Sequence, residues 1–492
     1  MQRYKTYEPT QSVFISFSPE EYFPVGSFER FLVDVFGKVN FEEYEEGTQF
    51  EFDQGGEAPY DPRAVFGAIF YGFARGVFSS RKLEKSCKQD MGFMYVSGFS
   101  TPDHSTFSRY ISERAQLITL IFSKVLYLAD QLGYLDYRLI ATDGTKIKAN
   151  ASHQFTGTIE NFRKRQAALT KKIEDALAEH RRAENRDEGE RLAKRIKRYH
   201  ANYERVQHFL DQAEKIETKK GKEILQNITD RECRVMKIDG SYSEGYNAQA
   251  SCSDAHGLIV AAKVGNNIDD KENMFKMTDE VIKTVPEQAK RKLPHSKYLF
   301  DKGYYSTANI LKAIQGGMDI YIPDAKDAKF YSNERRKLKR SLGSEDCEIA
   351  QDEKGLFLRC PGGRVMRDWK TKMNNGKEFY RFPVLTPSLC QGCNYHEICI
   401  GKQSINWKDF TILKAKVDER CQLSDYARKI HSPDGKRIYS NRMPLIERTF
   451  GYVKELIGFR RFLRRGLKKV NNEWLLVCTT YNLTRMFGLN SS

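Results

Sequence analysis

Three acidic residues occupy positions where carboxylates could do chemistry. Asp143 and Asp301 each end an apolar run that is expected to be a buried strand, and Glu447 lies in the basic segment 439–454, which is expected to be helical. Carboxylates at two strand ends and on a late helix can hold two divalent cations beside a phosphodiester. Mg²⁺ suits such a site because it binds a few carboxylates and keeps several of its waters. These residues therefore indicate metal-dependent phosphoryl transfer.

The neighbours of these acids separate them from the other carboxylates in a chain with 65 Asp and Glu residues. A lone Asp at a strand end is more often a turn or helix-cap residue than a metal ligand. Here Gly144 and Gly303 follow the two aspartates by one or two residues, where a surface turn is expected. Lys454 comes seven residues after Glu447, two turns along one helix face, so one residue could bind metal while the other holds phosphate. A solvated amphipathic helix is the alternative.

A cysteine cluster predicts a second kind of metal site. Cys390 and Cys393 form a C-x-x-C pair, Cys399 follows, and Cys360 lies upstream on an expected strand. Four thiolates can bind Zn²⁺ tetrahedrally, and His396 could replace one of them. Reduced cysteines in a loop are the alternative. Zinc here would be structural, because a small subdomain with little hydrophobic core gains folding free energy from the metal.

The composition favours a polyanionic partner in a reducing compartment. The chain has 492 residues, a net charge of +16 and a pI near 9.2. Such a charge favours nucleic acid, an anionic membrane or an acidic protein equally. No run of about 18 apolar residues could span a membrane, and the first ten residues do not read as a signal peptide. Ten cysteines in so large a chain do not suggest a disulfide scaffold, so we expect a cytoplasmic protein without a membrane partner.

Two segments are candidates for contacts with DNA. A basic run interleaved with aromatic residues follows the glutamate, and it contains Arg460, Arg461, Arg464 and Arg465. Beside a phosphodiester-cleaving centre some of these should hold phosphates, with an affinity that falls steeply with salt. Nearer the N-terminus, two short helices joined by a Gly-containing turn suit a helix-turn-helix. Its second helix, 103–114, would present Ser105 and Arg109 to a major groove, and plain helical packing is the alternative.

Changes in sequence pattern divide the chain into six segments. Helical periodicity dominates the first and the last, alternation marks the strands, and a run dense in Lys, Arg and Glu suits a coiled-coil hairpin. The segments are an N-terminal helical domain (1–135), the first part of a catalytic domain (136–156), an inserted helical hairpin (157–225), the second part of the catalytic domain (226–323), a cysteine-bearing insertion (324–435) and a C-terminal helical part (436–492). Residues 185–189 are expected to break the helical run in the middle. The hairpin could be a solvated spacer, a DNA clamp or a dimerisation arm.

The order of the expected elements defines the fold class. Within the catalytic domain it runs strand, hairpin, two strands, helix, strand, helix and strand. This is the order of an RNase H-like fold, an α/β class in which a mixed sheet is flanked by helices. Helices are expected to resume from about Pro444, and the last one, from Asn472, should pack on the sheet through Trp474.

Three blocks of this sequence resemble the catalytic blocks of bacterial insertion-sequence transposases of the DDE class. They are Thr-Asp-Gly-Thr around Asp143, Phe-Asp-Lys-Gly-Tyr around Asp301, and Ile-Glu-Arg-Thr-Phe-Gly-Tyr-Val-Lys around Glu447. Segments 102–106 and 245–249 also resemble recurrent motifs of that family. The resemblance covers nearly the whole chain, and its last block is the most specific.

The resemblance implies an RNase H-like fold and a DNA transposase. The catalytic residues, which would bind two Mg²⁺ or Mn²⁺ ions per active site, would be Asp143, Asp301 and Glu447. The protein would bind terminal inverted repeats in double-stranded DNA, then cleave and transfer strands within a synaptic homodimer. It would be associated with the nucleoid in the cytoplasm.

The family also carries a Tyr-x2-Arg-x3-Glu-x6-Lys signature around the catalytic glutamate. The residues that match it here, and that would contact DNA, are Tyr439, Arg442 and Lys454. Four residues separate Arg442 from Glu447 instead of three, and Pro444 is among them. Two rival functions stay open: a nuclease on the same fold that does not join ends, and a catalytically inactive DNA-binding or regulatory descendant.

Overall fold

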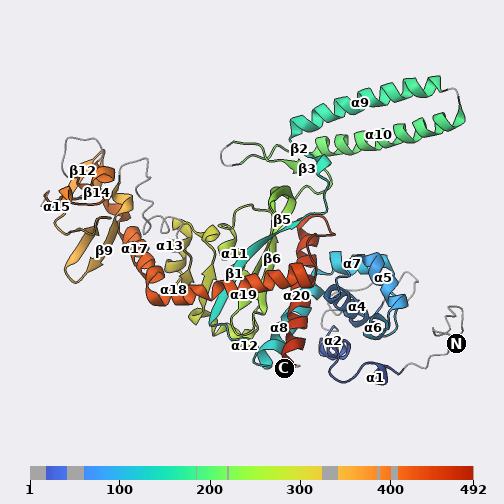
Figure 1. Ribbon diagram of the computed structural model, residues 1–492, viewed down its shortest axis with the longest axis horizontal. Coiled ribbons are helices and arrows are strands. Elements are labelled where there is room, and N and C mark those ends of the chain that lie inside the picture. Colours follow the sequence, from blue (N-terminus) through green and yellow to red (C-terminus); the bar gives the residue numbers. More distant parts are fainter. Residues whose placement is uncertain are drawn as a thin grey trace, which may run out of the picture.

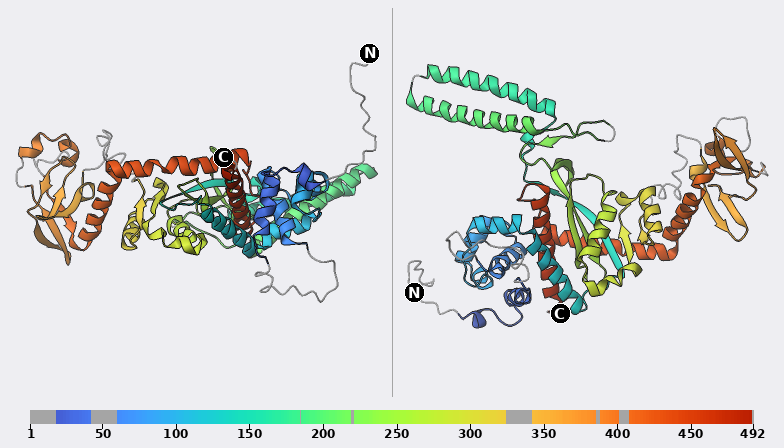
Figure 2. Two further views of the ribbon diagram at one scale, coloured as in Figure 1. Left: turned by 90° about the horizontal axis from the view of Figure 1, so that it is seen from below. Right: turned by 180° about the vertical axis from the view of Figure 1, so that it is seen from behind.

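A central mixed sheet flanked by helices forms the body of the molecule in the computed structural model (Figure 1). The structure describes residues 18–41, 60–183, 185–218, 221–323, 342–384, 388–400 and 408–490. A helical hairpin projects from one end of the body, and a small β-rich subdomain lies at the other end (Figure 1, Figure 2). The predicted α/β class is therefore confirmed. Residues 324–341 of the expected insertion lie outside the described residues.

The N-terminal region is helical, as expected. Its helices are α1 (Pro19–Tyr22), α2 (Phe28–Gly37), α4 (Pro62–Ala74), α5 (Ser80–Gln89), α6 (Met91–Val96), α7 (His104–Glu113) and α8 (Ala115–Gln131). The predicted helix 103–114 is α7. The helix begins at His104, because Asp103 is its N-cap and accepts a hydrogen bond from the Thr106 N–H at 2.9 Å. In the described parts of the chain, no helix is long and apolar enough to cross a membrane.

The central sheet is built around the 13-residue strand β5. Its strands are β1 (Leu139–Lys148), β4 (Arg234–Ile238), β5 (Ser241–Ser253), β6 (Ile259–Gly265), β7 (Lys297–Phe300) and β8 (Asp319–Tyr321). Strand β5 is antiparallel to β1, β4 and β6, whereas β1, β7 and β8 run parallel to one another. The order across the sheet is β6-β5-β1-β7-β8, with β4 also paired to β5. Strand β4 was not predicted.

Helices cover the sheet, and the last helix is buried along most of its length. They include α11 (Asn273–Thr284), α12 (Glu287–Lys290), α13 (Thr307–Gln315) and α20 (Leu467–Asn490). Helix α20 packs between β6 and the N-terminal helix α8. Trp474 Nε1 donates to the Gln249 carbonyl at 2.9 Å, which confirms the predicted packing of Trp474 on the sheet. The helix starts five residues before the predicted Asn472.

A hairpin of two long helices, α9 (Ile159–Arg182) and α10 (Arg186–Gln212), lies between β1 and β4 in the chain. Asn185 caps α10, in the patch where a break was expected. At the base, β2 (Thr156–Gly157) pairs with β3 (Gln226–Asn227), so the chain leaves and rejoins the body at one place. Phe162 and Phe209 pack against each other near this base and form part of a small apolar cluster. The hairpin therefore has its own minor core.

The β-rich subdomain consists of two three-stranded sheets with two short helices. Its elements are β9 (Glu348–Asp352), β10 (Gly355–Arg359), β11 (Val365–Met366), β12 (Lys370–Asn374), β13 (Lys377–Phe382), β14 (Phe410–Leu413), α15 (Ser388–Gln391) and α16 (His396–Ile400). Eight buried hydrophobic residues form its core. This core is small beside the continuous one that joins the sheet to the N-terminal helices.

Three helices lead from the subdomain back to the sheet: α17 (Val417–His431), α18 (Pro433–Ser440) and α19 (Arg442–Gly451) (Figure 1). The expectation that helices resume only from about Pro444 is wrong, since they begin at Val417. Pro433 is the first residue of α18 and Pro444 the third of α19. Backbone N–H groups in a first turn have no intrahelical acceptor, so proline is tolerated there and does not mark the end of a helical region.

Candidate active site

The pairing of β1 with β7 makes two of the predicted carboxylates neighbours. The parallel register ends with Thr142 opposite Phe300, so Asp143 and Asp301 come next on adjacent strands. Adjacent strands lie about 4.8 Å apart, and residues in register point to the same face. Asp143 does not end its strand as expected, because β1 continues to Lys148 along β5. What ends at Asp143 is the parallel pairing with β7.

Asp143 is largely buried, and both of its oxygens accept hydrogen bonds. Oδ1 accepts from the Gly144 N–H at 2.8 Å, and Oδ2 accepts from Arg442 Nη2 at 2.6 Å. Burial raises the pKa of Asp143 to about 6; the Arg442 guanidinium opposes this shift, and the carboxylates of Asp301 and Asp270 add to it. Negative charge gathered in a partly desolvated place favours a bound cation.

A third aspartate, Asp270, lies beside this pair and was missed by the sequence analysis. Three side chains donate to its Oδ1: Asn247 at 2.6 Å, Gln249 at 2.8 Å and Lys146 at 3.5 Å. A β-carbon on Gly303 would lie 3.4 Å from Asp270 Oδ2 and 3.7 Å from Asp301 Oδ2. The two carboxyl groups therefore border the same space.

Lys146 and Asp270, which the sequence analysis both missed, differ in how far the sequence alone could have identified them. Lys146 is a charged residue on a strand expected to be buried, and such a charge needs a partner. Asp270 lies in the loop after β6, five residues beyond the strand, and no apolar run ends at it. Lys146 could therefore have been found from the sequence, and Asp270 could not.

Glu447 lies apart from this group of charges. Helix α19 buries Arg442, Ile446 and Thr449, and it packs on β1 and β5. Glu447 is about 140° around the helix from Arg442 and is exposed. Across the described segments, no group of three or more His, Cys, Asp or Glu side chains is arranged to hold a metal ion. Of the three predicted ligands, the fold thus brings Asp143 and Asp301 together.

The α-helix that carries Glu447 does not continue to Lys454. It ends at Gly451 and passes into a π-helical turn, η8 (Tyr452–Leu456), where the Ile457 N–H donates to the Tyr452 carbonyl at 3.0 Å. Because a π turn alters the angular spacing, the expectation that Glu447 and Lys454 share a face of one α-helix is wrong. Lys454 is half-buried. Such turns are frequent at functional sites.

Arg442 and Tyr439 face the aspartates. Arg442 is only 6% exposed, and its guanidinium pairs with Asp143. Tyr439 is half-buried on α18; burial raises its pKa, Arg442 opposes this, and Asp301 and Asp143 add to it. We expected both residues to contact DNA, but in this arrangement Arg442 is turned to a carboxylate.

The predicted basic run is divided between the surface and the interior. Its exposed members are Arg460, Arg461 and Arg465. Arg464 is turned inward beside Glu473 of α20, which accepts the backbone N–H groups of Leu463 and Arg464 at 3.0 to 3.1 Å. Burial raises the pKa of Glu473 to about 7, against the effect of Arg464. Arg464 therefore has a structural partner.

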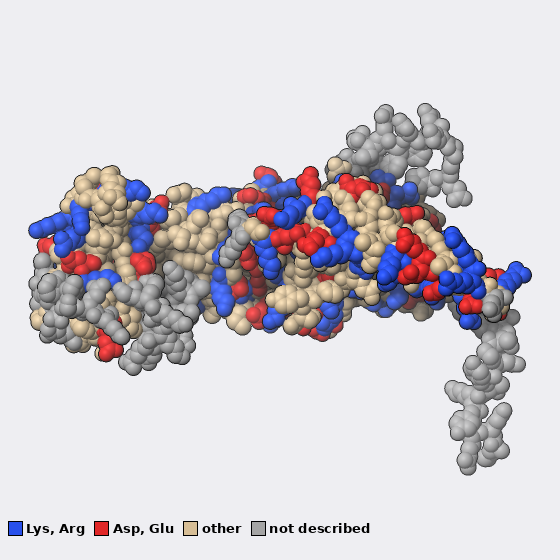
Figure 3. Space-filling model, turned by 90° about the horizontal axis from the view of Figure 1, so that it is seen from above, with Lys and Arg blue, Asp and Glu red and all other residues tan. Residues whose placement is uncertain are grey.

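Two members of the run line a recess at the base of the hairpin. Arg461 and Arg465 share it with Arg205 and His208 of α10, and its volume is ≈ 750 Å³. Arg465 Nε donates to the Asn150 carbonyl at 2.8 Å, which orients the side chain. Lys and Arg are interleaved with Asp and Glu over the face shown in Figure 3. Local clusters such as this recess are therefore better candidates for phosphate contacts than net charge alone.

Helix α7 exposes the two residues that we expected to reach a DNA groove. Ser105 and Arg109 are exposed, whereas Phe107 and Ile111 are buried. The helix packs on α5, where Glu84 accepts a hydrogen bond from the His104 N–H at 3.0 Å. An outward polar face on a well-anchored helix is compatible with a recognition helix, and its contact with DNA stays a prediction.

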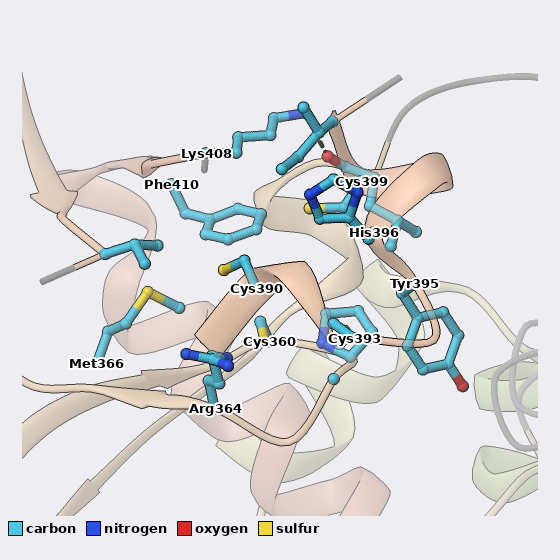
Figure 4. Close-up of a pocket in the computed structure, with 15 residues that line it drawn as sticks. Cys360, Arg364, Met366, Cys390, Cys393, Tyr395, His396, Cys399, Lys408 and Phe410 are labelled. Atoms are coloured by element: carbon cyan, nitrogen blue, oxygen red, sulfur yellow. Dashed lines mark hydrogen bonds between the residues drawn. The ribbon is translucent and has the colours of Figure 1, made fainter. Parts of the chain in front are cut away.

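The four predicted cysteine ligands line a single cavity of the β-rich subdomain (Figure 4). Cys360 follows β10, Cys390 lies on α15, Cys393 follows it, and Cys399 lies on α16. His396 lines the same cavity. Burial raises the pKa of Cys390 and that of Cys399, the latter to about 11. The ten cysteines, all within the described residues, form no disulfide.

Comparison with known families identifies the chain. Residues 359–487 match a family model described as Transposase DDE domain, and residues 18–113 match one described as Transposase domain (DUF772). The first match includes Glu447 and the cysteine cavity, and the second includes α7. No curated protein matches the chain. The two matches indicate an insertion-sequence transposase of the DDE class, an enzyme acting on DNA.

Proposed function

We propose that this transposase binds the terminal inverted repeats of an insertion sequence, cleaves DNA at the element ends and joins those ends to target DNA. The β1–β7 register carries the proposal, because it makes Asp143 and Asp301 neighbours. The order β6-β5-β1-β7-β8, with β5 alone antiparallel to the rest, supports an RNase H-like catalytic domain. The hairpin and the β-rich subdomain would be insertions in it.

Asp143, Asp301 and Glu447 would hold two Mg²⁺ or Mn²⁺ ions. A set of carboxylate oxygens fits such hard cations, which also keep several waters. When bound, the ions would neutralise the phosphate oxygens and activate the attacking oxygen. Asp143 and Asp301 supply the rigid part of the site, since Asp143 lies on the paired strand β1 and Asp301 directly follows its neighbour β7. Glu447 is exposed and lies apart from this pair, so it would join the site only if α19, which packs over β1, turned on the sheet.

Other side chains position these acids. Arg442 orients the Asp143 carboxylate through Oδ2. The amides of Asn247 and Gln249 keep Asp270 beside the pair. Water would attack the phosphodiester at the element end and leave a 3′-hydroxyl. That hydroxyl would then attack a target phosphodiester, where one P–O bond forms as another breaks.

Contacts outside the acidic centre would bind the DNA of a synaptic homodimer. Arg460, Arg461, Arg465 and Lys454 are the candidates for backbone phosphates, and Ser105 and Arg109 of α7 for a groove. The double substitution Arg461→Ala with Arg465→Ala should weaken binding and lower the slope of log affinity against log salt by about two. Arg138→Ala, at the opposite end of β1 from Lys148, is the matched control and should leave the slope unchanged. Equal slopes in all three proteins would remove the recess from the DNA-binding surface.

The decisive test of cleavage is Asp301→Asn, which removes one ligand charge and keeps the size of the side chain. With inverted-repeat DNA and Mg²⁺, we expect no cleavage and unchanged DNA binding. Asp319→Asn on β8 is the control, because Asp319 lies in the same sheet and pairs with Lys429. Full cleavage by Asp301→Asn would remove Asp301 from the site. Pre-cut ends that are not joined to target DNA would indicate a nuclease, and binding without cleavage by the unaltered protein would indicate an inactive descendant.

A further inference from the structure

Two tight turns in the β-rich subdomain begin at cysteines. The Cys360 N–H donates to the Arg364 carbonyl at 2.8 Å, and the Gly363 N–H donates to the Cys360 carbonyl at 2.9 Å, which closes the turn between β10 and β11. The Cys393 N–H donates to the Cys390 carbonyl at 3.2 Å and closes a second turn after α15. Both turns border the same cavity, so they bring three thiols to it.

A glycine marks the place where the two turns meet. A β-carbon on Gly362 would lie 2.6 Å from Cys393 Sγ and 3.7 Å from Cys360 Sγ. The first distance is closer than real β-carbon contacts, so any side chain at this position would displace the Cys393 sulfur. The Cys393 sulfur of the second turn therefore occupies the space that a side chain at position 362 of the first turn would need.

Helix α16 contributes the remaining polar groups. His396 and Cys399 are three residues apart, a spacing that puts both on one helix face, and both line the cavity (Figure 4). His396 Nε2 is buried and has no hydrogen-bond partner among the described residues. Leaving a buried polar nitrogen unsatisfied is costly. A charged group held by the thiols would give this imidazole an acceptor.

The size of the cavity and the charges around it limit which ligand it can bind. Its volume is ≈ 30 Å³, far below that of a pocket for a drug-sized organic ligand. Arg364 and Lys408 line it, and no Asp or Glu in the described part of the subdomain does. Four thiolates around one divalent ion carry two net negative charges, which these two cations balance. Sulfur ligands in a closed tetrahedral set favour Zn²⁺.

We propose that the β-rich subdomain is organised by one Zn²⁺ ion bound by Cys360, Cys390, Cys393 and Cys399. These thiols line one cavity but are not grouped closely enough there to hold a metal, so their side chains would turn toward the ion on binding. His396 would donate from Nε2 to a zinc-bound sulfur. The role of the ion is structural, because the hydrophobic cluster in the described part of this subdomain is small and metal binding would supply folding free energy. This site goes beyond the transposition chemistry and does not depend on it.

The test measures zinc in the purified full-length protein and its variants. We expect about one zinc per chain in the unaltered protein and in Cys421→Ser, and almost none in Cys393→Ser. Cys421 is the matched control because it packs against the same core but does not line the cavity. After exchange into Co²⁺, the protein should show a strong thiolate-to-cobalt charge-transfer band. His396→Gln should keep both the metal and the band.

A second variant keeps the test valid if Cys393→Ser does not fold. Cys399→His replaces a thiolate with another zinc ligand, so it should retain the metal and show a Co²⁺ spectrum with fewer thiolates. A metal-free unaltered protein without a cobalt band would overturn the proposal. Loss of zinc from His396→Gln together with its retention in Cys399→Ser would overturn the four-thiolate ligand set.

Discussion

The acidic edge of the central sheet and the cysteine cavity position their side chains by different means. Asp143 and Asp301 are placed by the register of two paired strands within a large continuous core. Cys360 and Cys390 are placed by turns above a small core. A metal at the first site would act on a scaffold that is already folded, whereas a metal at the second would complete the scaffold. Metal removal should therefore have different consequences at the two sites.

Chelation should separate the two sites most clearly. EDTA also binds Zn²⁺ tightly, so the catalytic metal is removed by leaving Mg²⁺ out of the buffer. This should stop DNA cleavage without changing the unfolding temperature of the sheet, and added Mg²⁺ should restore cleavage. A strong zinc chelator should make the segment 342–416 sensitive to protease, because the subdomain then loses its organising ion. Limited proteolysis with mass spectrometry measures this. Protease cuts within β1 or β7 at the same chelator concentration would show that the central sheet also depends on zinc, against this prediction.

A matched pair of glycine substitutions should sharpen the comparison. A β-carbon on Gly144 would overlap the Gln249 amide and lie 2.7 Å from Asn247 Oδ1 and 2.9 Å from Asp270 Oδ1. Gly144→Ala should therefore displace this network, cost about 1–3 kcal/mol of unfolding free energy, and abolish most cleavage. Its zinc content should not change.

Gly362→Ala is the counterpart in the cysteine cavity. The added carbon would push away Cys393 Sγ, so zinc content should fall while DNA cleavage per folded molecule is kept. Urea unfolding, metal analysis and a cleavage assay on both variants give the comparison. Gly376→Ala would be a poor control because its φ is 71°; Gly488→Ala, with open space around it, is suitable. Loss of zinc from Gly144→Ala would show that the regions are coupled.

The smallest expected effect concerns Glu473, a carboxyl group that is buried in the body and is not a predicted metal ligand. The pKa of Glu473 in the folded protein is about 7, above its ordinary value of 4.5, because burial disfavours the charged form. Stability from this group should be fully present below about pH 4.5 and lost as the pH rises through about 7. Glu473→Gln should flatten that part of the profile in urea unfolding at a series of pH values. Identical profiles would mean that Glu473 does not titrate in this window.

The positions of the main strands and helices along the chain could be predicted from the sequence. Apolar runs before Asp143 and Asp301 identified β1 and β7, and their parallel pairing then follows from the element order. The break at Asn185 divided the hairpin helices as expected. C-x-x-C spacing identified Cys390 and Cys393, and Cys360 and Cys399 could be added because they lie in the same insertion. Local pattern was sufficient in each case.

Side-chain direction was not predictable, because it depends on packing against distant elements. Arg464 lies in the loop before α20, and its guanidinium is partly buried close to Glu473, nine residues later on that helix. The π-helical turn after Gly451 leaves no mark in composition, yet it changes where Lys454 points. Glu447 is exposed because Arg442, Ile446 and Thr449 occupy the buried side of α19. None of these facts follows from spacing alone.

The short β2–β3 ladder has a consequence for how this enzyme can evolve. Thr156 pairs with Asn227 and Gly157 with Gln226, so the two chain segments that connect the hairpin to the body lie side by side. Adding or removing helical turns beyond that ladder would not move the two connecting segments or the strand that carries Asp143. The length of the hairpin can therefore change in evolution without moving the strand that carries Asp143.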